Sequence, residues 1–212
     1  MTIDELMRLA TVIPVLVIDD VAHAEPIARA LVAGGLPVLE VTLRTPCALD
    51  AIRTMKAVPG AIVGAGTVLD EGMLWTAIDA GARFIVSPGL TDSLARAAIA
   101  SEVPFLPGIA TAGDIMRGLD HGLARFKFFP AEAAGGLPAL KALAGPFRDI
   151  RFCPTGGITA DSAAQWLAHP SVLCVGGSWI LPAGERDTAA VAVRARDAAS
   201  LGKASAARGR DL

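Results

Sequence analysis

Two charged residues stand inside segments whose other side chains are typical of buried strands. Lys127 lies in ARFKFF (124–129), among phenylalanines, and Glu40 lies in PVLEVTLRT (37–45). Because desolvating an ammonium group is costly, a lysine in such a segment needs a reason. An amine in an apolar pocket has its charged form disfavoured and becomes a nucleophile toward carbonyl carbon. A carboxylate beside it can supply the proton transfers that this chemistry requires.

The alternation of side chains along a strand predicts that these two residues face one interior. Glu40 shares a face of its strand with Thr42 and Arg44, and Lys127 shares a face of its strand with Phe129. We expect the opposite, apolar faces to pack on helices. The alternative is a buried ion pair without a chemical role, since interior polar layers also occur in ordinary barrels. Positions toward the carboxyl ends of the strands favour the chemical role.

Paired glycines follow two later strand-like segments, in CPTGGIT (153–159) and CVGGSW (174–179). Glycine pairs let backbone N–H groups approach an anion closely, and loops after the last two strands of a barrel often hold a phosphate. The pattern favours a phosphorylated substrate over simple tight turns. Thr67, in AIVGAGTV (61–68), is either a hydrogen-bond donor to a ligand or an ordinary turn residue.

Eight apolar segments, at a spacing of roughly 20 residues, must position these side chains. They are VIPVLVID (12–19), PVLEVTL (37–43), AIVGAGTV (61–68), RFIVSPG (83–89), PFLPGIA (104–110), RFKFFPA (125–131), IRFCPTGGI (150–158) and VLCVGGSW (172–179). Segments rich in alanine and leucine, with helical periodicity, separate them. Strand and helix in alternation predict a parallel sheet with right-handed crossovers.

We therefore expect an α/β fold, a single (β/α)8 TIM barrel over residues 1–199 with an extra helix at its N-terminus. An open doubly wound sheet is the alternative, although such sheets usually have fewer strands. The small, polar and basic end of the chain, residues 200–212, is predicted to be a disordered tail.

Composition excludes several classes of protein. The chain has 212 residues, 53% of them hydrophobic, and a net charge of −2, which disfavours nucleic acid and anionic membranes as partners. No apolar run is long enough to span a bilayer, and the acidic N-terminus is not a signal peptide. Three widely spaced cysteines and three scattered histidines fit neither a disulfide framework nor a metal site. These features predict a cytoplasmic protein with free thiols and no metal.

Seven motifs occur in an order that resembles a known family: VLEVTLRT, VGAGTV, SPGLT, LPGI, FKFFPAE, FCPTGGI and VGGSW. Together, over residues 5–182, they resemble the 2-keto-3-deoxy-6-phosphogluconate (KDPG) and 4-hydroxy-2-oxoglutarate (KHG) aldolases. The resemblance implies a class I aldolase without cofactor, a homotrimer, that cleaves KDPG to pyruvate and glyceraldehyde 3-phosphate in the Entner–Doudoroff pathway. It also implies KHG, which yields pyruvate and glyoxylate, as a further substrate.

The same resemblance implies a role for each matching residue. Lys127 forms the Schiff base with the C2 ketone, and Glu40 is the general acid and base. Arg44 and Thr67 bind the pyruvyl carboxylate. The residues implied for the phosphate are Gly156, Gly157, Gly177 and Ser178, and those implied for the apolar wall around the imine are Pro88 and Phe129.

Two alternatives stay open at this point. The enzyme could prefer the C4 epimer of KDPG, or unphosphorylated KHG, as its main substrate. The chain could also be a non-catalytic barrel that binds or senses a sugar phosphate, in which Lys127 is only a phosphate contact or an ion-pair partner. Covalent trapping separates the second alternative from an aldolase, because a sensor forms no imine.

Overall fold

The structure is a computed structural model that describes the backbone of residues 1–208 and the side chains of residues 1–201. Its strands, all paired in parallel, form a six-stranded sheet in the order β5-β4-β3-β2-β1-β9 and a three-stranded sheet in the order β6-β7-β8. The strands are β1 (Val12–Leu16), β2 (Val38–Thr42), β3 (Ile62–Gly66), β4 (Ile85–Val86), β5 (Phe105–Leu106), β6 (Gly108–Ile109), β7 (Arg125–Phe128), β8 (Arg151–Pro154) and β9 (Val175–Gly177).

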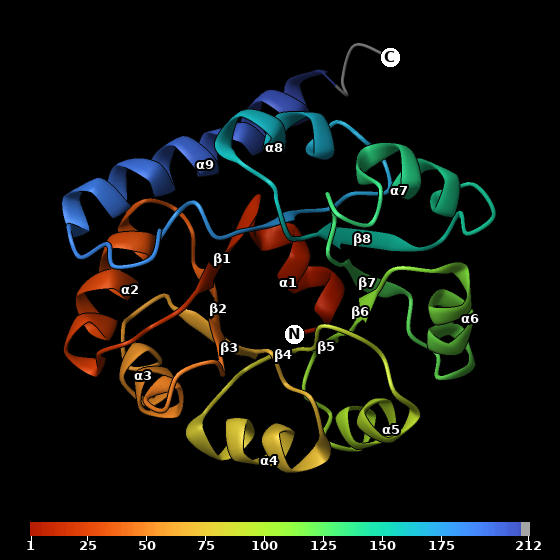
Figure 1. Cartoon of the computed structure of the whole chain (residues 1–212). Helices are drawn as coiled ribbons and strands as arrows, with labels where there is room; N and C mark the ends of the chain where they lie inside the picture. The colour runs from red at the N-terminus through yellow and green to blue at the C-terminus, as the bar shows by residue number, and fades with distance from the viewer. Residues whose placement is uncertain (209–212) are drawn as a thin grey trace.

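Each of the eight predicted segments contains a strand, and the fifth contains two. Pro107 separates β5 from β6, since proline has no N–H with which to continue the ladder. On the far side of the three-stranded sheet, parallel bridges join Phe152 to Val172 and Thr155 to Gly176. The two sheets therefore curve around a common centre (Figure 1). The prediction of a parallel α/β fold is confirmed.

The helices that follow the strands lie outside the sheets (Figure 1). They are α2 (Ala24–Ala33), preceded by the 3-10 turn η1 (Val21–His23), α3 (Ala48–Met55), α4 (Glu71–Ala80), α5 (Asp92–Ala100), α6 (Ala112–Asp120), α7 (Gly136–Ala144), α8 (Ala160–Leu167) and α9 (Thr188–Arg208). Their apolar faces form one core with the outward-facing strand residues, among them Leu39, Val41, Phe126 and Phe128. Burial of these apolar surfaces holds the two layers together.

The extra N-terminal helix is confirmed as α1 (Ile3–Leu9), which lies across the centre of the ring of strands in Figure 1. Leu6 and Met7 are fully buried there against inward-facing residues near the amino ends of the strands, such as Val38. Asp4 of α1 pairs with Arg125, the first residue of β7. This helix closes the amino-terminal end of the strands, so the carboxyl-terminal end is left for a site.

The backbone of the C-terminal helix α9 is helical through Arg208. Residues 209–212 of the predicted tail lie outside the described residues, and the disorder of residues 200–212 stays a prediction. Alanine, the residue with the highest helix propensity, is frequent in this segment, which accounts for the continuation. No helix within residues 1–208 has both the length and the apolarity needed to cross a membrane.

Candidate active site

Lys127 on β7 and Glu40 on β2 meet in the interior. The Nζ atom of Lys127 donates a hydrogen bond to Oε1 of Glu40 at 2.9 Å. Both residues are buried, with exposed fractions of 5% for Lys127 and 3% for Glu40. The prediction from strand alternation, that these residues share one interior, is confirmed. Because the strands belong to different sheets, only the curvature of the sheets makes them face each other.

The phenylalanines next to Lys127 in sequence do not surround its amine. Phe126 and Phe128 are fully buried in the outer core, on the opposite face of β7. Phe129 instead lies beside the amine, with Nζ 5.4 Å from the centre of its ring, within the range of a cation–π contact. This ring limits the access of water to one side of the amine.

A glycine makes room for the carboxylate of Glu40. A Cβ atom at Gly66, the last residue of β3, would lie 2.2 Å from Oε1 and 2.7 Å from Cγ of Glu40. No larger residue fits there without moving the carboxylate. Sequence reasoning did not assign this role to Gly66, although glycine inside a strand is a known sign of close approach by another group.

Arg44 and Thr67 also come together at this end of the strands. Nε of Arg44 donates a hydrogen bond to Oγ1 of Thr67 at 3.3 Å. Thr67 has a φ angle of +61°, which is unfavourable for a β-branched residue. Such strain commonly marks a functional position. Arg44 lines the same cavity as Lys127, so a guanidinium and an amine face one ligand space.

That cavity contains most of the predicted site. Predicted residues that line it are Arg44, Lys127, Phe129, Gly156, Gly157 and Ser178, and further lining residues are Val15, Thr155, Ile158 and Gly176. Glu40 does not line the cavity itself, but it lies within hydrogen-bond distance of Lys127, which does. The arrangement therefore joins an amine, a carboxylate, a guanidinium and a glycine-rich loop in one small space.

Two predicted residues are placed differently from the others. The ring of Trp179 packs against Gly177, in space that a side chain at this position would need. Gly176, rather than Gly177, lines the cavity. The carbonyl group of Pro88 packs against the backbone of Gly108, and Pro88 is not among the lining residues.

Sequence reasoning missed Thr155, which is buried and donates from Oγ1 to the carbonyl oxygen of Cys153. The sequence did contain a signal for it. Thr155 lies two positions beyond Cys153, which is on the inward face of β8, and residues two positions apart share a face of a strand.

Two thiols, those of Cys153 and Cys174, lie in the interior. Cys153 is the residue of β8 that pairs with Lys127 in the sheet, and Cys174 belongs to the same buried cluster. A hydrogen bond with Cys153, together with burial, raises the pKa of the Cys174 thiol well above its ordinary value. A protonated thiol is a poor nucleophile, so this thiol does not compete with the amine of Lys127.

A buried amine with a carboxylate at hydrogen-bond distance can form an imine with a keto acid and then move protons, which is the chemistry of pyruvate-dependent aldolases. The family model described as KDPG and KHG aldolase matches residues 3–193. The chain therefore belongs to the KDPG and KHG aldolase family. The resemblance drawn from the motifs is confirmed, and the alternative of a non-catalytic sensor is set aside.

Individual relatives agree with this assignment. The 2-dehydro-3-deoxy-phosphogluconate aldolase of Zymomonas mobilis is 62% identical over 97% of this chain and 99% of its own. The KHG/KDPG aldolase of Escherichia coli is 55% identical over 85% of each chain. The structure of a KDPG aldolase from Legionella pneumophila, with pyruvate captured as a covalent carbinolamine intermediate, is 43% identical, with a TM-score of 0.89 over 95% of this chain and 98% of that one.

Proposed function

We propose that this aldolase cleaves KDPG reversibly to pyruvate and glyceraldehyde 3-phosphate through a Schiff base on Lys127, the lyase step of the Entner–Doudoroff pathway. The 2.9 Å contact between Lys127 and Glu40, buried beside a cavity, carries the proposal. The relatives named above support the substrate. The carbinolamine in the Legionella relative supports the covalent mechanism.

The first half of the reaction builds an electron sink. The neutral amine of Lys127 attacks the C2 carbonyl carbon, so an N–C bond forms and the carbonyl electron pair moves to oxygen. Glu40, within hydrogen-bond distance of the nitrogen, relays two protons from it to the oxygen, one taken from the ammonium group before the attack and one released after it, so the oxygen leaves as water. The product is a protonated imine at C2.

The second half breaks the carbon–carbon bond. The carboxylate of Glu40 removes the proton of the C4 hydroxyl, the C3–C4 electron pair moves into the iminium, and glyceraldehyde 3-phosphate is released as the aldehyde. The enamine that remains takes a proton at C3. Water then hydrolyses the imine, which releases pyruvate and regenerates the amine of Lys127.

The remaining site residues bind the two ends of the substrate. Arg44, already aligned by Thr67, presents planar donors that suit the carboxylate of the pyruvyl unit. The phosphate is held by the backbone N–H groups of Gly156 and Gly157 and by Ser178, which all line the cavity, and Gly176 takes the place expected for Gly177. The apolar wall around the imine is formed by Phe129, whereas Pro88, also implied for it, does not line the cavity. The ring of Phe129 beside Nζ supports the last assignment.

We also propose that the two sheets form one closed (β/α)8 barrel. The single residue Pro107 between β5 and β6, and the bridges from Phe152 and Thr155 toward β9, support closure on both sides. By family resemblance, we propose a cytoplasmic homotrimer. Light scattering during size-exclusion chromatography tests the trimer, which has three times the 21.7 kDa mass of one chain.

KHG is the second candidate substrate, because the family description and the Escherichia coli relative both name it. It lacks a phosphate, so the glycine loop contributes nothing to its binding. We expect a higher kcat/KM for KDPG than for KHG, since binding energy from the phosphate can be used in the transition state. Steady-state kinetics with both substrates test this order.

Borohydride reduction in the presence of pyruvate, followed by peptide mass spectrometry, tests the covalent step. We expect a reduced pyruvyl adduct on Lys127 and none in Lys127→Ala. The exposed Lys141 provides the matched variant Lys141→Ala, which should form the adduct normally. An unmodified Lys127, in protein that demonstrably binds pyruvate, would overturn the Schiff-base assignment.

A further inference from the structure

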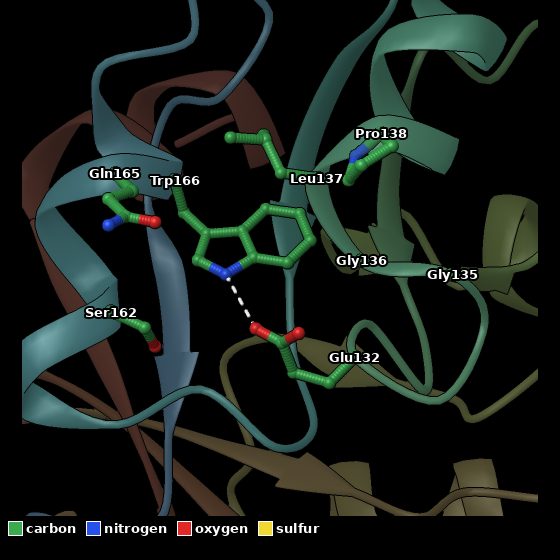
Figure 2. A pocket seen from close by; sticks show the side chains of 8 residues that line it. All are labelled: Glu132, Gly135, Gly136, Leu137, Pro138, Ser162, Gln165 and Trp166. Carbon is green, nitrogen blue, oxygen red and sulfur yellow. Dashed lines mark hydrogen bonds between the residues drawn. The ribbon is translucent and has the colours of Figure 1, made fainter.

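The side chain of Glu132, just beyond β7, connects helix α8 with the glycine loop that follows β8. Figure 2 shows its carboxylate directed at the indole of Trp166. Nε1 of Trp166 donates a hydrogen bond to Oε1 of Glu132 at 3.1 Å. The indole itself is fixed, since Trp166 is 2% exposed and packs against Phe128 with ring centres 6.3 Å apart. The carboxylate of Glu132 is thus anchored to a rigid group.

The stem of the same side chain lies against the loop. A Cβ atom at Gly157 would lie 2.7 Å from both Cβ and Cγ of Glu132, so the loop backbone rests on this stem. The backbone N–H of Glu132 donates to the carbonyl oxygen of Gly156 at 3.0 Å, and that of Ala131 donates to Thr155 at 2.8 Å. Main chain and side chain of Glu132 therefore both contact the loop.

The loop needs such support. Gly156 and Gly157 have φ angles of +101° and +81°, and consecutive glycines have little conformational preference of their own. Both line the cavity that contains Lys127. A shift of the loop would move the backbone N–H groups offered to a phosphate, without displacing the amine or Glu40.

We propose that Glu132, held by Trp166, is a positioning residue that fixes the Gly156–Gly157 loop and thereby selects phosphorylated substrates. This inference rests on the proposed function. Glu132 itself touches neither the amine nor the reacting carbons. Its effect is confined to the phosphate half of the site, which distinguishes it from a residue that only stabilises the fold.

The test compares two reactions of one protein. Cleavage of KDPG depends on the phosphate, whereas exchange of the methyl protons of pyruvate with D2O, followed by NMR, needs only the imine and enamine at Lys127. For Glu132→Ala we expect KM for KDPG to rise by about tenfold, since small displacements of binding groups are costly, while pyruvate exchange stays within about twofold.

Three variants sharpen the comparison. Glu132→Gln keeps an oxygen that accepts the indole N–H and should restore the wild-type KM. Trp166→Phe keeps the aromatic packing but removes the N–H, and should raise KM for KDPG selectively, which provides a second route if Glu132→Ala folds poorly. Glu71→Ala is the matched control, because Glu71 accepts the indole N–H of Trp75 at 3.2 Å on the exposed surface of α4; it should change neither reaction.

Equal losses in both reactions, or an unchanged KM for KDPG in both Glu132→Ala and Trp166→Phe, would overturn the inference. The same two reactions, measured on the wild-type protein, show whether the inference about Glu132 or the proposed substrate is at fault. If it exchanges pyruvate protons but does not cleave KDPG, the proposed substrate is wrong, and the inference falls with it. If it cleaves KDPG and the variants show no selectivity, only the inference is wrong.

Discussion

Lys127 and Glu40 are 87 residues apart in sequence, yet Nζ and Oε1 are joined by a 2.9 Å hydrogen bond. They are also the two charged residues in the buried set of the described side chains. A buried ion pair contributes little net stability, because the cost of removing both charges from water offsets their attraction. The chemistry proposed for this pair, rather than stability, therefore accounts for its place in the interior.

Replacing the carboxylate of Glu40 by an amide keeps the size and shape of the side chain but removes its ability to transfer protons. In Glu40→Gln the amide oxygen can still accept the N–H of Lys127, but the side chain cannot shuttle protons. We expect kcat for KDPG to fall by about 10²- to 10⁴-fold, as measured by steady-state kinetics. Glu25→Gln, on the surface of α2 where Glu25 pairs with Arg29, is the control. A kcat close to wild type would remove Glu40 from the mechanism.

Gly66→Ala should displace the carboxylate without removing it. The added Cβ would lie 2.2 Å from Oε1 of Glu40, so the side chain must rotate or shift. We expect kcat for KDPG to fall by about 100-fold, because misplacement of a catalytic group by about 1 Å has an effect of this size. Gly113→Ala in α6, where the new atom would have its nearest neighbour at 3.7 Å, should leave kcat unchanged. Equal kinetics in both variants would contradict the positioning role.

Arg44→Lys keeps the positive charge but loses the planar fork of donors and the bond from Nε to Thr67. Loss of one hydrogen bond to a charged group is expected to raise KM for KDPG by about tenfold. The rate of imine trapping at saturating pyruvate should change little, which separates binding from chemistry. Arg53→Lys, at an exposed pair with Asp50, is the matched control. A fall in kcat with unchanged KM would argue against carboxylate binding by Arg44.

The pair between Asp4 and Arg125 predicts a pH-dependent contribution to stability. Hydrogen bonds from Arg8 and then from Arg125 hold the pKa of the Asp4 carboxyl below its ordinary value of 3.8. A lowered carboxyl pKa stabilises the fold above the unfolded-state value, and this stability is lost as pH falls through the folded-state value. Asp4→Asn should therefore lower Tm at pH 7 by about 2 °C, given a partly exposed pair.

Thermal unfolding at several pH values checks this prediction. The difference in Tm between wild type and Asp4→Asn should be constant from pH 7 down to about pH 5 and should shrink as pH drops below 3.8. Asp50→Asn removes a pair within one helix, where Asp50 contacts Arg53, and should have a smaller effect. A difference that grows with acidity would have the wrong sign for this linkage.

The local pattern of apolar and polar residues, together with short motifs, was enough to predict much of the fold and of the site. The eight apolar segments indicated the strands, and the period of two placed Lys127 and Glu40 on inward faces. The motifs indicated the family, which the comparisons confirmed. These features depend on residues within one strand or one motif, where neighbours in sequence are neighbours in space.

Contacts between distant segments could not be predicted in this way. The approach of Gly66 to Glu40, the placement of Gly176 in the cavity in place of Gly177, and the anchoring of Glu132 by Trp166 each depend on how two or more elements pack.

The sequence by itself determined which residues could do the chemistry and on which face of each strand they lie, because backbone geometry fixes the alternation of side chains. Only the tertiary structure decided that the amine and the carboxylate are within hydrogen-bond distance, and which glycines give them room. The physical reason is that strand curvature and side-chain packing depend on contacts among residues far apart in the chain, which no local pattern contains.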